Sequence, residues 1–498
     1  MPGGSDAPFH PFSSTSLSYL LRGRQMIRSH YIERSSVSVV TNELGEFAFV
    51  TPDLDISNVG ITHPRYRDLE ARGFLQHAGP TGGLAAIVRR TRKAFVKEGP
   101  SLHIFVVSLR CDHSCQYCQV SRASLTATGK DMTLEHALMA VERVFESDAP
   151  TLTIEFQGGE PALRFDLIRK IVEASNARAA RDCRSVRFTM ATTLHLLSQE
   201  DLQFCKEHGI HLSTSLDGPE DVHTLQRALP TRDSWKRTIE GLARARAIVG
   251  QSGVAALPTI TRAMLSRPEE LVSTYLAFGF NSIFLRPLAP YGFAKKTQKQ
   301  LGYTVPEFMA FYERALAEIL RLNVEGREIQ ETTAAILLRH ILTPFHSGYM
   351  DLRSPAGAGL GVVVYNYDGG VFPSDEARMA AESGDRRFRL GHVSEPLEAL
   401  LVSPAMRWLA KGAVAEQLTD CAKCAFVPYC GADPVHHAIV HGDPAAPRAG
   451  TDFCDRNTAL FRLLFGMLAD RDPETTRTFT SWAMGIPRSE AEPGWIEQ

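Results

Sequence analysis

The chain has 498 residues, of which 44% are hydrophobic and 22% charged, and its formal net charge is −2 at pH 7. This composition is typical of a folded soluble protein and excludes the disordered, collagen-like and membrane-spanning classes. The near-zero charge gives no reason to expect nucleic acid or a membrane as a partner. Because the N-terminus, Met1–Phe12, lacks a charged start followed by an apolar stretch, we expect no secretory signal and a cytoplasmic location.

Residues 1–95 predict a small N-terminal α+β module. A hairpin is expected from Ser36–Asn42 and Glu46–Thr51, and a helix from Pro64–Phe74. A module of this kind can bind a peptide as an added strand. A packing extension of the next domain explains the same pattern, and both interpretations stay open.

Residues 96–300 alternate short apolar runs with longer amphipathic runs, which indicates a parallel sheet with right-handed crossovers. Strands are expected at Leu102–Ser108, Leu152–Phe156, Val186–Met190, Ile210–Ser215, Val254–Ile260 and Asn281–Arg286. Helices are expected at Thr133–Glu146, Arg164–Ala180, Gln199–His208, Ser234–Val249 and Pro268–Phe278. Six strands are too few for a closed eight-stranded barrel, so the predicted fold class is α/β with a partial (β/α)6 barrel.

The remaining residues predict three further parts. Residues 301–350 form an expected helical connector, in which Pro306–Asn323 has apolar residues at helical spacing. Residues 351–470 form the next domain, where Val362–Tyr365 and the turn Asp368–Gly370 are typical of a β-hairpin. Residues 471–498 are expected to be a helical or loosely held tail.

The nine cysteines indicate the class of chemistry. In a chain without an export signal we expect reduced thiols rather than disulfides. Cys183 and Cys205 lie apart from the others and are expected to be inert. The other seven fall into two groups: Cys111, Cys115 and Cys118, then Cys421, Cys424, Cys430 and Cys454.

The first group lies in one loop just after the first barrel strand. The carboxyl ends of barrel strands are where α/β barrels place their reactive groups. Three thiolates leave one coordination position of a metal open to a ligand that is not protein. A catalytic zinc ion with His113 as a further ligand is one interpretation, but three soft ligands in a single loop favour a 4Fe–4S cluster.

The spacing of Cys111, Cys115 and Cys118, with Tyr117 before the last cysteine, resembles the motif of the radical S-adenosylmethionine (SAM) superfamily. Further segments match this family in order, each after a predicted strand: Gln157-Gly158-Gly159-Glu160-Pro161, Thr192, Ser215 and Arg227. The resemblance implies a radical SAM barrel in which these residues and Tyr117 bind SAM.

The resemblance also implies roles for single SAM contacts. The backbone after Gly158 and the Glu160 carboxylate would hold the methionyl amine, and the Ser215 region would contact the ribose. Arg227 would pair with the methionyl carboxylate, for which a planar guanidinium is suited. The alternatives are a plain tight turn at the two glycines and a surface ion pair for Arg227.

The second group supplies four thiolates, enough to close a metal site. A zinc ribbon is one interpretation. The spacing instead resembles the auxiliary-cluster half of the SPASM extension, an iron–sulfur domain of radical enzymes that modify peptides and proteins. Where a complete extension holds a second auxiliary cluster, this chain has Ser354 (or Pro355), Ser374 and Pro434 in place of cysteines. The resemblance therefore implies two 4Fe–4S clusters in all, one that binds SAM and one auxiliary.

One aspartate is a candidate catalytic base. In one class of peptide-modifying relatives an aspartate follows the hairpin cysteine and takes a substrate proton, and Asp375 stands at that position. Because the preceding cysteine is missing, an ordinary exposed turn aspartate is the alternative interpretation.

Shorter motifs resemble the B-type maturase family of the His-Xaa-Ser peptide system. They are Phe9–Phe12, Asn42–Glu46, Tyr429–His437, His441–Asp443 and Asp452–Cys454. The resemblance implies an enzyme that takes hydrogen from a ribosomally synthesised precursor peptide, with oxidative cross-linking as the expected reaction. The expected partners are a precursor peptide with His-Xaa-Ser repeats, a second radical SAM maturase, and an electron donor such as flavodoxin or ferredoxin. The alternatives are a peptide epimerase, another radical peptide modification, or a non-catalytic protein that presents the precursor to a second maturase.

Overall fold

The computed structural model describes residues 27–75, 88 and 91–492 of the chain. The motif Phe9–Phe12 lies outside the described residues. A sheet of eight strands forms the centre, in the order β13-β12-β11-β4-β5-β6-β7-β8. No helix among the described residues has the length and apolar character needed to cross a membrane.

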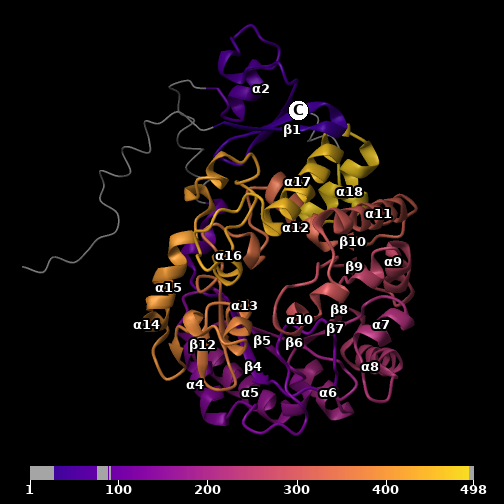
Figure 1. Cartoon of the computed structure of the whole chain (residues 1–498), viewed down its shortest axis with the longest axis vertical. Coiled ribbons are helices and arrows are strands. Elements are labelled where there is room, and N and C mark those ends of the chain that lie inside the picture. Colours follow the sequence, from indigo (N-terminus) through magenta and orange to yellow (C-terminus); the bar gives the residue numbers. More distant parts are fainter. Residues whose placement is uncertain (1–26, 76–87, 89–90, 493–498) are drawn as a thin grey trace, which may run out of the picture.

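The parallel part of this sheet contains the predicted barrel elements (Figure 1). Its strands are β4 Leu102–Ser108, β5 Thr151–Gly158, β6 Ser185–Ala191, β7 Ile210–Ser215 and β8 Val254–Leu257. The helices are α4 Leu134–Phe145, α5 Phe165–Arg181, α6 Gln199–Glu207, α7 Glu220–Gln226, α8 Ser234–Val249 and α9 Pro268–Ala277. The five strand predictions from Leu102 to Ile260 and the five helix predictions are confirmed, with small differences at the ends.

Local chemistry accounts for these elements. Residues 103–108 of β4 are all buried, because a parallel strand is covered on both faces. Helix α6 begins at a capping box, in which the Ser198 side chain and the Asp201 side chain each bond the other residue's backbone N–H. Gly209 and Gly279 end helices with positive φ angles of 63° and 67°.

The sixth barrel strand is shorter than predicted, and this expectation was wrong. Only Ser282–Ile283 forms a strand, β9, and it pairs with β10 (Gln330–Glu331) rather than with β8. A single bridge between Thr259 and Arg286 connects this segment to the strand before it. The buried Glu331 carboxylate accepts the Leu285 N–H at 3.1 Å, so a side chain takes a donor that a neighbouring strand would otherwise use.

The predicted hairpin is confirmed, and it has a further role in the sheet. Strand β11 (Val362–Tyr365) pairs in parallel with β4, and β12 (Gly370–Phe372) and β13 (Gly391–His392) follow antiparallel. The barrel sheet is thereby extended by residues more than 250 positions after β4. Helix α13 (Asp375–Glu382) begins directly after this hairpin, with Ser374 as its N-cap.

Eight further α-helices lie among the described residues after β9. They are α10 Gly292–Leu301, α11 Val305–Val324, α12 Thr332–Leu342, α14 Leu397–Leu401, α15 Pro404–Leu409, α16 Pro434–His441, α17 Asp452–Asp470 and α18 Pro473–Met484. The predicted connector helix corresponds to α11. The tail is helical as far as α18, which packs against α12 and buries Phe479 and Trp482.

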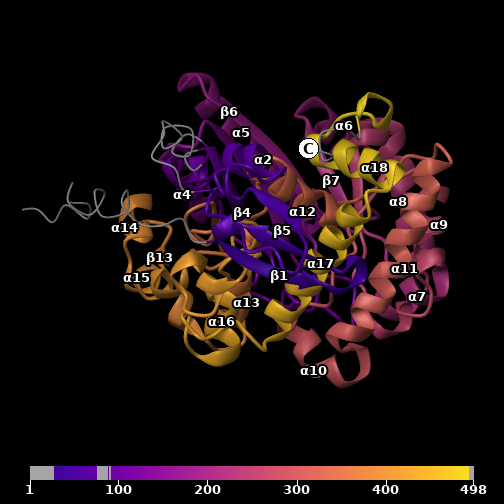
Figure 2. The ribbon, with the colours of Figure 1, turned by 90° about the horizontal axis from the view of Figure 1, so that it is seen from above.

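Among the described residues, the N-terminal module contains a three-stranded antiparallel sheet and the short helix α2. The predicted hairpin corresponds to β2 (Val37–Thr41) and β3 (Phe47–Val50), the helix to α2 (Tyr66–Ala71), and β1 (Arg28–Ile32) was not predicted. Figure 2 shows β1 beside α17. The module packs on the segment with the second cysteine group: Thr41 Oγ1 donates to the Ala425 carbonyl at 2.7 Å.

Candidate functional site

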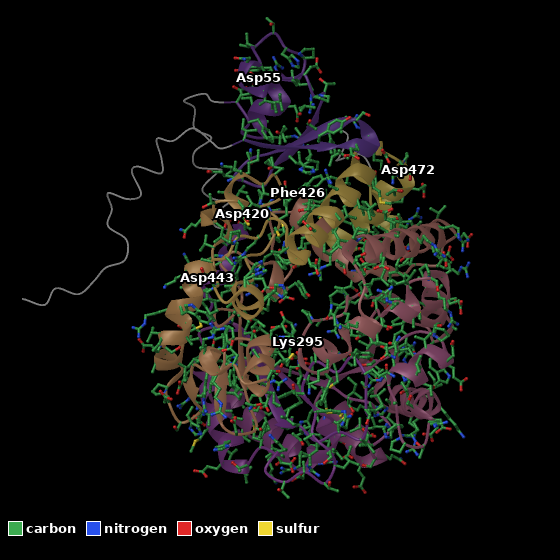
Figure 3. The ribbon with its side chains drawn as sticks, in the orientation of Figure 1. Asp55, Lys295, Asp420, Phe426, Asp443 and Asp472 are labelled. Atoms are coloured by element: carbon green, nitrogen blue, oxygen red, sulfur yellow. The ribbon has the colours of Figure 1, made fainter. Side chains whose placement is uncertain are left out.

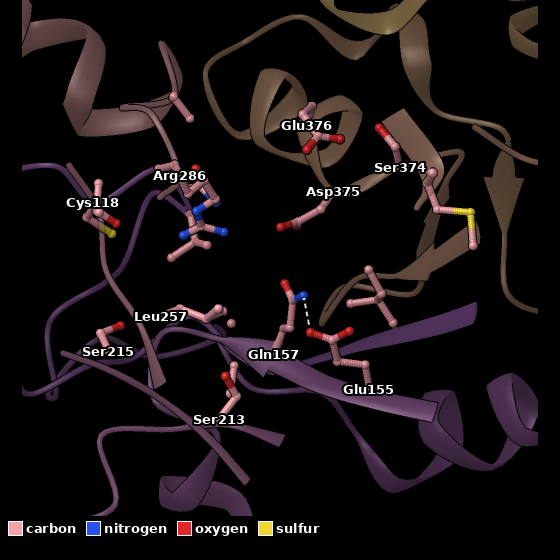
Figure 4. Close-up of a pocket in the computed structure, with 18 of the residues that line it drawn as sticks. Cys118, Glu155, Gln157, Ser213, Ser215, Leu257, Arg286, Ser374, Asp375 and Glu376 are labelled. Carbon is pink, nitrogen blue, oxygen red and sulfur yellow. Dashed lines mark hydrogen bonds between the residues drawn. The ribbon is translucent and has the colours of Figure 1, made fainter. Parts of the chain in front are cut away.

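A cavity of about 440 Å³ lies at the carboxyl ends of the barrel strands. Its barrel wall contains nearly all residues predicted to hold the first cluster or SAM: Cys111, Cys115, Tyr117, Cys118, Gln157, Gly158, Gly159, Glu160, Thr192, Ser215 and Arg227. Pro161 is the exception: it is buried and does not line the cavity. The facing wall comes from the C-terminal half and includes Asp375 and Glu376 of α13 (Figure 4).

The cysteine loop is fixed by bonds just before its first cysteine and at its middle. Arg110 donates to both carboxylate oxygens of Asp131 at 2.8 Å, and the Ser114 N–H donates to the Ala228 carbonyl at 2.7 Å. Burial raises the pKa of Cys115 to about 11, against the effect of the Arg227 cation. Buried thiols of this kind ionise when a metal cation binds them.

Asp112 joins the cysteine loop to another part of the barrel. Its carboxylate accepts from His113 Nδ1 at 2.9 Å and from His195 Nε2 at 2.8 Å. Burial alone would raise the pKa of Asp112, but these two hydrogen bonds outweigh it and the pKa lies below its usual range. One ligand atom of Cys111, one of Asp112 and one of His113 lie within 4.8 Å of one another. This group contains neither Cys115 nor Cys118, so it is not the ligand set of the zinc alternative.

The two glycines pack directly on the backbone that leads into the cysteine loop. A Cβ atom on Gly158, where φ is +134°, would stand 2.0 Å from the Ser108 carbonyl oxygen. A Cβ on Gly159 would stand 2.3 Å from the Arg110 carbonyl oxygen. The Gly159 N–H donates to Ser108 O and the Glu160 N–H to Arg110 O, both at 2.8 Å. This turn therefore requires glycine, and it fixes the distance between the two motifs.

The Glu160 carboxylate is fully buried. It accepts from Thr192 Oγ1 at 2.7 Å, the Thr193 N–H at 2.7 Å and the Ala162 N–H at 2.9 Å. Glu160 also lines the cavity, and its expected contact with the methionyl amine stays a prediction. In this structure Glu160 organises the turn after β6, of which Thr192 lines the cavity.

Arg227 lies at the other side of the cysteine loop. Its Nη1 donates to the Tyr117 hydroxyl at 2.9 Å, and that hydroxyl donates to Asp217 at 2.5 Å. Only 8% of Arg227 is exposed, so the alternative of a surface ion pair was wrong. Its Nε is buried without a hydrogen-bond partner, an arrangement that fits a carboxylate ligand in the cavity.

Asp375 points into the cavity toward Gln157 (Figure 4). Its side chain is 14% exposed, which excludes the exposed turn aspartate, and it accepts from Nε of the buried Arg378 at 2.9 Å. The candidate base Asp375 therefore forms an ion pair with Arg378, and Glu376 beside it lines the same cavity.

Sequence reasoning missed a group of three carboxylates, Asp351, Glu376 and Asp433, on the same wall. Burial raises the pKa of Glu376 to about 8, and the charges of Asp351 and Asp375 add to the rise. The three also line a second cavity of about 550 Å³, which shares part of its wall with the first. The sequence contains little that indicates this group. Asp433 lies in the motif Tyr429–His437, but nothing in the sequence places it near Glu376.

The four later cysteines are neighbours in space. Burial raises the pKa of Cys430, and the thiols of Cys424, Cys421 and Cys454 add to the rise. Asn457 Nδ2 lies 3.7 Å from the Cys430 sulfur, and the Phe426 N–H lies 3.4 Å from the Cys424 sulfur. Such donors stabilise the sulfur ligands of iron–sulfur clusters.

Two of the three positions that lack cysteine are hydrogen-bonded serines, and the third, Pro434, is the first residue of α16. Ser354 Oγ donates to Glu416, which also pairs with Lys93 at 2.7 Å. Ser374 Oγ accepts the Ala377 N–H at 3.2 Å as the cap of α13.

Residues 105–266 match the radical SAM superfamily. An uncharacterized protein of Methanocaldococcus jannaschii is 29% identical over 205 residues, which are 41% of this chain and 68% of that protein. The PqqA peptide cyclase of Bradyrhizobium diazoefficiens is 23% identical over 235 residues, 46% of this chain and 55% of that protein. The solved structure of native anSMEcpe with bound SAM and the Cp18Cys peptide has a TM-score of 0.61 at 17% identity, covering 74% of this chain and 98% of that one.

Proposed function

Because the chain contains a radical SAM domain, we propose that it is an enzyme that modifies a ribosomally synthesised peptide with SAM and a 4Fe–4S cluster. One observation carries the proposal: three cysteine thiols, the glycine turn and the buried Arg227 line one cavity. When bound, the cluster and SAM would supply a 5′-deoxyadenosyl radical, which takes a hydrogen atom from a C–H bond.

The chain's own residues would bind and orient these groups. Cys111, Cys115 and Cys118 would hold three irons of the cluster. The unpartnered Nε of Arg227 would bind the methionyl carboxylate, and the backbone after Gly158 with the Glu160 carboxylate would bind the amine. Tyr117, Gln157, Thr192 and Ser215 would complete the SAM site, and the carboxylate wall of α13 would keep bulk water from the reacting centre.

A second 4Fe–4S cluster is proposed at Cys421, Cys424, Cys430 and Cys454. The neighbouring thiols and the donors from Asn457 and Phe426 support it. Because a zinc ribbon would use the same four ligands, the iron content decides between them. We expect about eight irons for each chain after anaerobic reconstitution.

The substrate is proposed to be a precursor peptide, and the reaction an oxidative cross-link. The second cavity joined to the first gives room for residues that flank the reacting one. The similarity to a peptide cyclase supports cross-linking over epimerisation. His-Xaa-Ser repeats, a second maturase and a flavodoxin or ferredoxin as electron donor remain part of the proposal.

The N-terminal module has one sheet edge that is already covered. Arg72 of α2 donates to the Phe47 carbonyl at 3.0 Å, and Arg65 donates to the Phe49 carbonyl. Both carbonyls belong to β3. If the module binds the precursor as an added strand, we therefore expect the β1 edge to receive it.

The experiment is reductive cleavage of SAM by anaerobically reconstituted enzyme, measured as 5′-deoxyadenosine. We expect product from the wild type and none from Cys115→Ala. Cys183→Ala is the control, because Cys183 is exposed and belongs to neither cysteine group. With a candidate peptide, mass spectrometry should show a loss of about two mass units for each cross-link. A wild type that binds zinc and forms no 5′-deoxyadenosine would contradict the proposal.

A further inference from the structure

The turn after β6 is held in an unusual conformation. Leu194 is fully buried and has a φ of +66°, although it is not glycine. This left-handed conformation costs free energy, and it persists where the surroundings hold the chain on both sides. The contacts on the two sides of Leu194 show what holds it.

On the N-terminal side, Glu160 holds the turn. Its carboxylate accepts from Thr192 Oγ1 and from the Thr193 N–H, both at 2.7 Å. Glu160 itself follows the two glycines whose backbone packs on Ser108 and Arg110. This side of the turn is thus tied to the proposed SAM-binding motif.

On the C-terminal side, His195 holds the turn. The His195 side chain is 6% exposed, and its Nε2 donates to Asp112 Oδ2 at 2.8 Å. Helix α8 also packs closely here, since a Cβ on Gly241 would stand 3.1 Å from the His195 nitrogen. This side of the turn is thus tied to the cysteine loop.

Asp112 connects His195 to the first cysteine of the loop, Cys111. It follows Cys111 directly, and its Oδ1 lies 3.8 Å from the Cys111 sulfur. The same carboxylate accepts from His113 Nδ1 at 2.9 Å, so two imidazole groups satisfy it inside the protein. A buried carboxylate that loses one of two donors is costly, and the loop would move to regain one.

We propose that His195 is a positioning residue: through Asp112 it locks the cysteine loop to the turn that Glu160 holds. The cluster ligands and the SAM-binding motif then keep one fixed relative position. This inference rests on the proposed function, because it assigns Cys111, Cys115 and Cys118 to a cluster. His195 does not line the cavity wall described above, and it acts through Asp112 rather than on the substrate.

The test compares His195→Leu with His195→Gln. Leucine removes the donor, whereas glutamine keeps an N–H group of similar reach. We expect His195→Leu to raise the KM for SAM by about 10- to 100-fold, the usual effect of losing a partner that orients a ligand loop. We also expect it to weaken the change that SAM causes in the electron paramagnetic resonance spectrum of the reduced cluster. His195→Gln should recover most of both properties.

His103→Leu is the matched control. His103 is a fully buried histidine with two hydrogen bonds, to Pro100 and Tyr365, and it lies on β4 away from the cysteine loop. It should lower the thermal midpoint and leave the SAM-dependent spectrum unchanged. Circular dichroism checks that all variants are folded.

Two results would overturn the inference. One is a His195→Leu enzyme with the SAM response and KM of the His103→Leu control. The other is a His195→Gln enzyme as impaired as His195→Leu, because side-chain volume rather than the donor would then matter. A wild type that gives no SAM-responsive cluster would instead overturn the proposed function.

Discussion

Glu376 is held in an environment that disfavours its charge. Burial raises its pKa to about 8, and Asp351, Asp375 and Asp433 add to the rise because their negative charges face it. Its neighbour Asp375 has Arg378 as a partner. Two adjacent carboxyl groups on one cavity wall are therefore in different electrostatic environments, a pattern common at sites of proton transfer.

The raised pKa predicts how stability depends on pH. The folded protein binds the Glu376 proton more tightly than the unfolded chain, whose ordinary pKa is 4.5. The contribution of Glu376 to folding stability should therefore fall as pH rises from about 4.5 to about 8 and stay constant above that range. Glu376→Gln removes this loss, so its thermal midpoint should exceed that of the wild type at pH 9, and the two should converge toward pH 5.

Glu382→Gln on the same helix is the control. Its carboxylate accepts from Asn366 Nδ2 at 3.3 Å, outside the carboxylate group. Thermal scans from pH 5 to pH 9 should give this variant the pH profile of the wild type. A Glu376→Gln profile parallel to the wild type would contradict the assignment.

Among the single residues of the site, spacing along the sequence predicted those that belong to short motifs. Three cysteines within eight positions and two glycines before Glu160 are visible without a structure. His195 and Glu376 were not predicted, because each depends on a partner from a distant segment: Asp112 for His195, and Asp351 and Asp433 for Glu376. Spacing along the chain carries no information about such contacts.

The glycine turn is the element on which the site geometry depends most. Backbone oxygens of Ser108 and Arg110 occupy the space that any side chain would need at Gly158 and Gly159. A larger residue would therefore push the turn and the cysteine loop apart.

Gly159→Ala tests this turn. We expect the rate of 5′-deoxyadenosine formation to fall about 100-fold, because a displacement near 1 Å is enough for such a loss. Gly60→Ala is the control, since no heavy atom lies within 4 Å of the position its Cβ would take. Retained activity in Gly159→Ala would show that the turn tolerates displacement.

The spacing of apolar residues, and the residues that begin and end helices, predicted the barrel elements. They could do so because the interactions that form these elements lie close together in the sequence. Ser198 starts α6 and Gly209 ends its last turn within a dozen residues. The prediction of the sixth strand was too long for a non-local reason, namely that Glu331 accepts the N–H of Leu285. The pairing of β11 with β4 was likewise outside any local pattern.

Over the whole molecule, the N-terminal module covers the second cysteine group. Figure 3 places Phe426 beneath this module. Phe465 of α17 is fully buried, and its ring packs against Phe47 of the module at 5.3 Å and against Phe426 at 5.8 Å. The first and last parts of the described chain thus share one aromatic cluster around the proposed auxiliary site.

Phe465→Ala should separate the two proposed clusters. Loss of this ring should lower the free energy of unfolding by about 3–5 kcal/mol. We expect the iron content after reconstitution to fall from about eight to about four, with the SAM-responsive spectrum retained. Phe308→Ala is the control: Phe308 is buried in α11, and its loss should cost similar stability while both clusters remain. Equal iron loss in both variants would contradict this expectation.

The parallel pairing of β11 with β4 has a consequence for biosynthesis. The outer edge of β4 has no neighbour until Val362–Tyr365 has been translated, although the rest of the barrel is already available. An apolar strand with an open edge invites association with other nascent chains. We therefore expect translation products that stop before Val362 to aggregate or to require a chaperone, even though they contain every ligand of the first cysteine group.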